Sequence, residues 1–208
     1  MVRWGQVIDL KKCVGCMSCV IVCKVENFTR PGVFWSRVIK SETGDSRHFT
    51  RINLPLLCMH CKDAPCEAVC PTGATQHRSD GIVWIDPGKC IGCKYCIETC
   101  PYGARYFNLD GTFFPGNITQ HEKFRERFPN KDHRLQVAGT VSKCVFCMHR
   151  VDKGLEPACV ANCPSVARYF GDLDDPKSEV SRLIRERGGF QLNPEFGTDP
   201  SVYYLPPR

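Results

Sequence analysis

The sequence predicts a loop-rich α+β fold in which two small, similar modules share one chain. Three observations support this prediction. The 16 cysteines of the 208-residue chain fall into four groups of four, with none left over. The segments around these groups repeat one another in register, which indicates a duplicated unit. The 17 glycines and 15 prolines predict many turns between short elements. We also expect a C-terminal helix followed by an extended tail.

The cysteine groups have spacings typical of ligands to iron–sulfur clusters. The first and third groups follow C-x2-C-x2-C-x3-C, the spacing of bacterial [4Fe–4S] ferredoxins. The second group widens the middle gap to four residues, and the fourth widens it to eleven. We therefore predict four [4Fe–4S] clusters as cofactors. The groups, in chain order, are Cys13, Cys16, Cys19 and Cys23; Cys58, Cys61, Cys66 and Cys70; Cys90, Cys93, Cys96 and Cys100; and Cys144, Cys147, Cys159 and Cys163.

Two other uses of clustered cysteines agree less well with these spacings. A disulfide scaffold does not need three cysteines within seven residues, and the start of the chain has no export signal. A zinc site pairs two C-x2-C units at a distance, so a third cysteine two residues further on would be redundant. Iron–sulfur clusters account for every cysteine.

The fourth cysteine of each group is expected to serve a neighbouring cluster. Three thiolates two residues apart on a tight loop can bind three corners of a cubane. The fourth lies on the helical turn that follows and points away from that cubane. A proline comes directly after three of the four groups and ends that turn. We therefore expect the groups to exchange their last ligands in pairs.

Internal repeats predict what each unit looks like. Residues 8–13 match residues 85–90, and residues 100–107 match residues 163–170. Short apolar, β-branched stretches that lead into residues 8–13 and into residues 85–90 predict strands. The unit is strand, cluster loop, helical turn and strand, which is half of a ferredoxin-like module. Four copies give two ferredoxin-like modules of the bacterial two-cluster type.

The connecting segments are longer than such modules need. Residues 24–57 contain Phe34, Trp35 and Phe49 and are expected to form strands that cover a cluster. Residues 113–137 include a highly charged stretch and are expected to form a surface insertion. It is either a solvated segment or a docking surface for a partner.

The end of the chain has clear helix signals. Asp175 is a good N-cap, Pro176 a good first helical residue, and Gly188 a good stop. We expect a helix over about residues 176–187. The tail over residues 193–208 should be extended and packed.

Composition and charge exclude several classes of function. The net charge of +6 counts cysteines as neutral, and four clusters with thiolate ligands change it to about −2. The basic residues thus compensate buried clusters and do not predict nucleic-acid binding. No run approaches the roughly 20 apolar residues that span a bilayer. No G-x-G-x-x-G, Walker or Ser/His/Asp signature predicts a catalytic centre. Electron transfer is the remaining role.

Several other side chains lie near the cysteine groups in sequence. His60 and His149 each follow a methionine, but every site already has four thiolates. We interpret both as groups beside the clusters or at the surface rather than as ligands. Basic residues near ligands can tune cluster potentials through charge or hydrogen bonds. The candidates are Lys89, Arg105, Lys143 and Arg168.

Three further features identify a family resemblance. They are the Cys-Met-His-Cys segment at residues 58–61, the eleven-residue gap of the fourth group, and the Gly-Asp-Leu-Asp-Asp-Pro segment at residues 171–176. Over about residues 3–205 the chain resembles the four-cluster iron–sulfur subunit of dimethyl sulfoxide reductase-type molybdoenzymes. Its length is most similar to the subunits of polysulfide, thiosulfate, tetrathionate or arsenate reductases.

The resemblance implies which groups exchange ligands: the first with the fourth, and the second with the third. Residues 1–50 with 138–175 would form one module, residues 51–112 an inserted one, and residues 176–208 the helix and tail. The implied ligand sets are cluster 1, Cys13, Cys16, Cys19 and Cys163; cluster 2, Cys58, Cys61, Cys66 and Cys100; cluster 3, Cys90, Cys93, Cys96 and Cys70; and cluster 4, Cys144, Cys147, Cys159 and Cys23.

The resemblance also implies partners. A large catalytic subunit would hold molybdenum or tungsten on a bis-pterin cofactor, and a membrane subunit would exchange electrons with quinone. The complex would be prokaryotic and membrane-associated, either periplasmic by co-export with the partner or cytoplasmic. Alternatives are an electron-transfer subunit of a tungsten aldehyde oxidoreductase or hydrogenase-type complex, and a free polyferredoxin.

Overall fold

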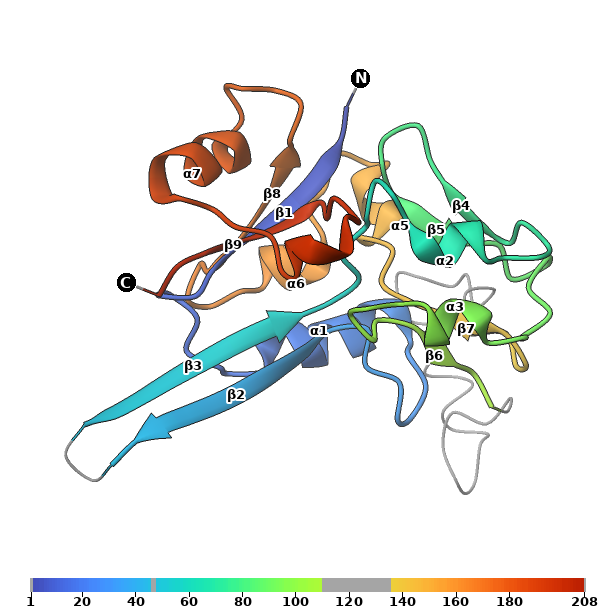
Figure 1. Ribbon diagram of the computed structural model, residues 1–208, viewed down its shortest axis with the longest axis horizontal. Helices are drawn as coiled ribbons and strands as arrows, with labels where there is room; N and C mark the ends of the chain where they lie inside the picture. Colours follow the sequence, from blue (N-terminus) through green and yellow to red (C-terminus); the bar gives the residue numbers. More distant parts are fainter. Residues whose placement is uncertain (1, 46–47, 110–135, 208) are drawn as a thin grey trace.

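A computed structural model of the chain describes residues 2–45, 48–109 and 136–207 (Figure 1). Nearly all of the insertion predicted for residues 113–137 lies outside these residues. The helices are α1 (Ser18–Asn27), α2 (Pro65–Ala68), α3 (Tyr95–Glu98), α5 (Met148–Val151), α6 (Ala158–Ala161), α7 (Glu179–Arg187) and the 3₁₀ helix η2 (Pro194–Phe196). The strands are β1 (Trp4–Asp9), β2 (Arg37–Gly44), β3 (Phe49–Leu56), β4 (Thr75–His77), β5 (Val83–Ile85), β6 (Tyr106–Phe107), β7 (Val141–Ser142), β8 (Arg168–Asp172) and β9 (Val202–Leu205).

A three-stranded sheet joins the two ends of the chain (Figure 1). Strand β1 lies in the middle, antiparallel to β8 and parallel to β9, so that Val7 is paired with both Tyr169 and Tyr203. The extended tail expected from the sequence is confirmed, and its strand β9 is a full member of this sheet. The mixed small sheets and short helices agree with the predicted α+β class.

Helix α7 covers one face of this sheet, but it begins later than predicted. Val180 of α7 is fully buried against Val7 and Leu205. The prediction of Asp175 as N-cap was wrong, because the Ser178 side chain accepts the hydrogen bond from the Ser181 N–H at 3.2 Å. Asp175 instead closes the turn before the helix. Its carboxylate accepts from one backbone N–H, and its carbonyl accepts from another.

The long connection after the first cysteine group forms the β2–β3 hairpin, which projects from the rest of the molecule (Figure 1). Its base behaves as predicted, since Val38 and Pro55 line the cavity between the first three cysteines of the first group and Cys163. Its outer part does not. Phe49, expected to cover a cluster, lies near the tip and is 62% exposed.

The two modules share one hydrophobic core. Trp35, Met59, Ile82, Phe146 and Tyr204 all belong to it, although they come from widely separated parts of the chain. The β4–β5 hairpin and the β6–β7 strand pair, with strands of only two or three residues, contribute Val83, Ile85 and Val141 to this core. Such short strands cannot form a stable sheet alone, so the core depends on contacts between modules.

A single hydroxyl connects the tail strand to the hairpin and gives a test of this packing. Tyr204 is fully buried, and its Oη donates to the carbonyl oxygen of Pro55 at 2.7 Å. Tyr204→Phe leaves that carbonyl without this donor and is expected to cost about 1 to 3 kcal/mol of stability. Thermal loss of visible absorbance measures the effect. The control is Tyr203→Phe, which removes a half-buried hydroxyl. An equal loss in both variants would contradict the assignment.

Candidate metal centres

Short helices place the last two cysteines of every group. Each third cysteine lies in a helix, at Cys19, Cys66, Cys96 and Cys159, and the fourth comes four residues later. In α1 the fourth cysteine lies in the same helix, about 6 Å or one turn along the axis from the third. Helices α2, α3 and α6 end two residues before the fourth cysteine, which follows in the next turn of the chain. One turn can therefore present its two thiols to two different sites.

The helices pack in pairs, and each pair brings two cysteine groups together. Helix α1 of the first group packs against α6 of the fourth, and α2 of the second packs against α3 of the third. Figure 1 shows both pairs. These contacts join the same groups that the sequence resemblance pairs.

Thiols of the first group lie close to thiols of the fourth group. Burial raises the pKa of the Cys13 thiol, and thiolates at Cys19 and Cys163 raise it further. Like charges placed close together oppose ionisation, so such effects mark neighbouring groups. Cys13 therefore has the neighbours expected in cluster 1.

The Cys23 thiol has a different set of neighbours from Cys19, one turn away on the same helix. Burial raises its pKa far above the usual range, and thiolates at Cys144, Cys147 and Cys159 raise it further. All three belong to the fourth group. Cys23 thus lies where the exchange of ligands requires it for cluster 4.

The second and third groups repeat this arrangement. Burial raises the pKa of the Cys61 thiol to about 12, with further increases from Cys58, Cys66 and Cys100. The neighbours of Cys61 are thus the cysteines predicted as the remaining ligands of cluster 2.

The Cys96 thiol shows the reciprocal exchange. Burial raises its pKa, and thiolates at Cys90 and Cys70 contribute to the rise. Cys70 comes from the second group, so the neighbours of Cys96 are those expected in cluster 3.

The donor set and the spaces between the thiols fit a cubane. All sixteen cysteines are free, and none is joined in a disulfide. Among the described residues, no three Cys, His, Asp or Glu side chains approach closely enough to hold a single metal ion. Two small hollows instead lie between thiols. Their cysteines are Cys70, Cys90, Cys93 and Cys96, and Cys13, Cys16, Cys19 and Cys163.

Two of the four basic candidates contact cluster cysteines directly. Arg105 is buried and donates from Nη2 to the Cys66 sulfur at 2.8 Å. Arg168 is buried and donates from Nη1 to the Cys159 sulfur at 3.6 Å. Hydrogen bonds to cluster sulfurs are a recognised means of setting potential.

The two lysine candidates differ sharply in environment. Lys143 is only 1% exposed, and its Nζ donates to the carbonyl oxygens of Val83 and Cys144. Lys89 is exposed to solvent. A charge in water acts weakly over distance, so Lys143 is the better placed to influence a cluster.

Two amides beside the thiols were not predicted from the sequence. Gln6 Nε2 lies 3.6 Å from the Cys159 sulfur, and Asn27 Nδ2 lies 3.5 and 3.6 Å from the sulfurs of Cys23 and Cys147. Gln6, which is fully buried, could have been noticed as a polar residue among the apolar residues of β1. Asn27 gives no such signal, since it ends a helix at a position where polar residues are common.

The two histidines occupy different surroundings. His60 is fully buried and stacks on Phe146 with ring centroids 3.7 Å apart, and its Nδ1 accepts from the Val83 N–H. Burial lowers the pKa of His60 well below its usual range, so the ring is neutral. His149 is half-buried and bonds Glu26 at 2.7 Å, which connects α5 to α1.

Exposure differs between the clusters. Cys16 of the first group and Cys93 of the third are exposed, whereas Cys144 and Cys58 are buried. Burial raises the pKa of the Cys144 thiol, and Cys58 is among the thiolates that raise it further. The fourth group therefore adjoins the second across the junction of the modules, and the exposed thiols lie at the two outer groups.

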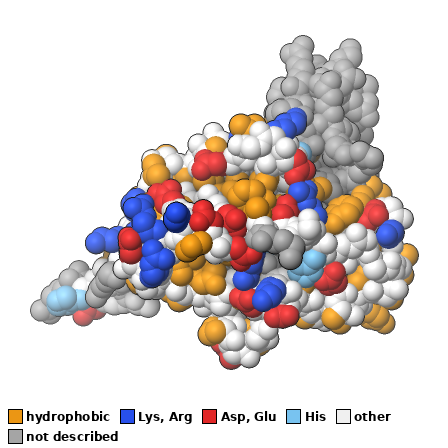
Figure 2. Space-filling model, turned by 90° about the horizontal axis from the view of Figure 1, so that it is seen from above, with side chains coloured by type: hydrophobic (Ala, Val, Ile, Leu, Met, Phe, Trp, Pro, Cys, Tyr) orange, Lys and Arg blue, Asp and Glu red, His pale blue; other side chains and the backbone are white. Residues whose placement is uncertain are grey.

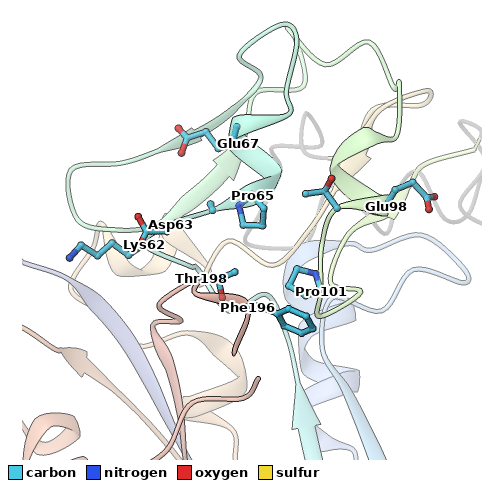
Figure 3. A pocket seen from close by; sticks show the side chains of 11 residues that line it. Lys62, Asp63, Pro65, Glu67, Glu98, Pro101, Phe196 and Thr198 are labelled. Atoms are coloured by element: carbon cyan, nitrogen blue, oxygen red, sulfur yellow. The ribbon is translucent and has the colours of Figure 1, made fainter. Parts of the chain in front are cut away.

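The surface offers places where a partner could sit. A hollow of about 830 Å³ lies beside the second and third groups (Figure 3). Pro65 and Pro101, which line it, neighbour Cys66 and Cys100, and the 53% exposed Phe196 forms another part of its wall. On the face in Figure 2, several Lys and Arg side chains gather at the left of the view, with acidic side chains beside them.

The fold and the thiol arrangement define an iron–sulfur protein of the ferredoxin type. Comparison with known protein families agrees. Descriptions of the 4Fe-4S dicluster domain match residues 49–114 and 113–173, and residues 12–74.

Curated relatives resemble the chain over nearly all of its length. A putative dimethyl sulfoxide reductase iron–sulfur subunit of Halobacterium salinarum is 45% identical over 99% of this chain and 79% of the relative. A subunit of the selenate reductase of Mesobacillus selenatarsenatis is 44% identical over 98% and 72%. The arsenate respiratory reductase iron–sulfur subunit of Shewanella sp. is 42% identical over 98% and 96%.

The chain belongs to the family of iron–sulfur subunits of these reductases. It is an electron-transfer subunit of a multi-subunit oxidoreductase, and its cofactors are four [4Fe–4S] clusters. Within the described part of the chain, no helix has the length and apolar character needed to cross a membrane.

Proposed function

We propose that this chain is a non-catalytic wire that carries single electrons through four clusters in the order 1, 4, 2, 3. One end serves a large catalytic subunit with molybdenum or tungsten on a bis-pterin cofactor. The other serves a membrane subunit that reacts with quinone, or a soluble carrier. The complex is a prokaryotic, membrane-associated respiratory reductase.

The observation that carries this proposal is the grouping of the thiols. The neighbours of Cys13, Cys23, Cys61 and Cys96 support the four ligand sets given above. They also support two modules, one from residues 1–50 with 138–175 and one from residues 51–112. Each set is complete with four thiolates, so no iron is left open to bind a substrate. Clusters with closed coordination transfer electrons only, which is why we assign catalysis to a partner.

The order of the clusters follows from which of them meet. Clusters 1 and 4 share helices α1 and α6, and clusters 2 and 3 share α2 and α3. The interaction between Cys144 and Cys58 supports a position of cluster 4 next to cluster 2. Clusters 1 and 3 are then the ends, and each has an exposed thiol, at Cys16 and Cys93. Buried middle clusters and exposed end clusters are what a wire between two partners requires.

Purification of the native complex tests the proposal. We expect the chain to co-purify with a large subunit that contains molybdenum or tungsten and pterin, together with about sixteen iron and sixteen sulfide per wire subunit. Metal analysis and pterin fluorescence give the answer. A complex with nickel or flavin in place of pterin would favour the hydrogenase-type alternative. A chain that purifies alone with all four clusters would overturn the proposal.

A further inference from the structure

We propose that Arg168, Lys143 and Arg105 place one buried positive charge in each of the three gaps of the wire, so that each cation serves two successive clusters. The order along the wire is then cluster 1, Arg168, cluster 4, Lys143, cluster 2, Arg105, cluster 3. This inference rests on the ligand sets and cluster order of the proposed function.

Arg168 lies between clusters 1 and 4. It is 3% exposed, and its Nη1 donates to the Cys159 sulfur of cluster 4 at 3.6 Å. Interaction with Cys19 and Cys163, both of cluster 1, raises its pKa, although burial opposes the rise. The side chain of Gln6 fixes the guanidinium by accepting from the same nitrogen at 3.0 Å. One guanidinium is thus within electrostatic reach of both clusters.

Arg105 has the corresponding position between clusters 2 and 3. It is 4% exposed, and its Nη2 donates to the Cys66 sulfur of cluster 2 at 2.8 Å. It also hydrogen-bonds the Cys96 thiol of cluster 3. The Thr75 hydroxyl accepts from Nη1 at 3.0 Å and orients the guanidinium.

Lys143 lies at the junction of the modules, between clusters 4 and 2. Its Nζ donates to the carbonyl oxygen of Cys144, a cluster 4 ligand, at 2.8 Å. It also donates to Val83, whose N–H bonds His60 of the second group. Burial raises the pKa of the Cys144 thiol and of the Cys66 thiol in cluster 2, and the Lys143 charge lowers both.

The counter-charges of these cations are the cluster thiolates. Among the described residues, none of the three forms a salt bridge with Asp or Glu. A buried cation without a carboxylate is costly unless other negative charge compensates it. Four thiolate-ligated clusters supply that charge.

The sequence repeat explains why there are three such cations. Arg105 and Arg168 are equivalent, since each comes five residues after the last cysteine of its group. Lys143 directly precedes Cys144, as Lys89 and Lys12 directly precede Cys90 and Cys13, yet those two lysines are exposed. Two modules have two internal gaps but only one junction. Only the lysine at the junction, Lys143, is therefore buried among these three lysines. Both arginines are buried, because each module has its own internal gap.

A shared cation has a predictable effect on potential. A cluster becomes more negative when it accepts an electron, and a buried positive charge stabilises that state in proportion to its proximity. A cation between two clusters stabilises the reduced form of each and offsets the repulsion between electrons on both. Removal of the cation should lower the potentials of both neighbours and leave the distant clusters unchanged.

Redox titration of the holocomplex followed by electron paramagnetic resonance tests this pattern. Arg168→Met, Lys143→Met and Arg105→Met should each lower the potentials of two cluster signals and leave two in place. The two signals shifted by Lys143→Met should include one shifted by Arg168→Met and one shifted by Arg105→Met. The two arginine variants should share none. This overlap identifies the gaps without prior assignment of any signal.

Matched variants separate charge from packing. Arg105→Lys and Arg168→Lys keep the charge and should return the potentials toward the wild-type values. Lys89→Met removes the exposed lysine equivalent to Lys143 and should shift no signal. Iron content is measured in every variant to confirm that all four clusters are present. If Lys143→Met does not assemble, the two arginine variants still test the inference, because they should shift no signal in common.

Three outcomes would overturn the inference: a variant that shifts one signal or all four, a signal shared by the two arginine variants, or equal shifts in Met and Lys variants. A wild-type complex with other than four clusters, or without a pterin partner, would instead count against the proposed function.

Discussion

Cys23→Ser is expected to damage cluster 4 and to leave cluster 1 comparatively intact, although Cys23 belongs to the first cysteine group. The thiol neighbours of Cys23 are Cys144, Cys147 and Cys159. A serine oxygen is a harder and poorer ligand for cluster iron than a thiolate, so that cluster should shift in potential or lose an iron. Paramagnetic resonance of the reduced complex records which signal changes.

The matched control lies one turn away on the same helix. Cys19 and Cys23 are both buried in α1, and both substitutions remove one thiol. Cys19→Ser should damage cluster 1, and so should Cys163→Ser from the other end of the module. If the α1 variants damage the same cluster, the exchange of ligands is wrong and each group binds its own cluster.

Removal of iron is expected to unfold most of the chain. The buried core contains many of the cluster cysteines, and the β4–β5 and β6–β7 pairs have strands of only two or three residues. Metal binding then supplies a large part of the folding free energy. Anaerobic holoprotein should contain about sixteen iron and sixteen sulfide, and chelation should abolish the native circular dichroism.

Zinc provides the critical comparison for this prediction. Zinc can bind thiolates, but a single ion cannot bridge thiols that are spaced for a cubane. Reconstitution with iron and sulfide should restore both the visible absorbance and the fold, whereas zinc should not. A zinc-loaded chain with native-like circular dichroism and no visible absorbance would show that the clusters are not needed for folding.

The features of the site that could be predicted from the sequence are those that depend on the intervals between residues. Cysteine intervals indicate clusters because the intervals are set by the size of the cubane, whatever surrounds it. The position of Arg105 and Arg168 after the last cysteine of a group was also visible, because the repeat places both residues equivalently. Local patterns of this kind predict structure well because each repeat folds into the same short turn.

Features that depend on tertiary packing were missed or misplaced. Nothing near Lys143 or Lys89 in sequence indicates that one is buried and the other exposed, because the difference comes from the junction of the modules. Phe49 has the apolar character of a core residue, yet it lies near the tip of a projecting hairpin. The N-cap moved from Asp175 to Ser178 because Asp175 is used by the preceding turn.

The central position of β1 has a consequence for synthesis on the ribosome. Gln6 in β1 and Arg168 in β8 are 162 residues apart, so at 5–20 residues per second the first strand waits roughly 8 to 30 s for a neighbour. The cysteines proposed as ligands of clusters 2 and 3 all lie between Cys58 and Cys100 and are synthesised much earlier than the fourth group. Translation therefore orders maturation from the inner module outward. During this interval both edges of β1 lack their partner strands, so their backbone groups are open to pairing with another strand.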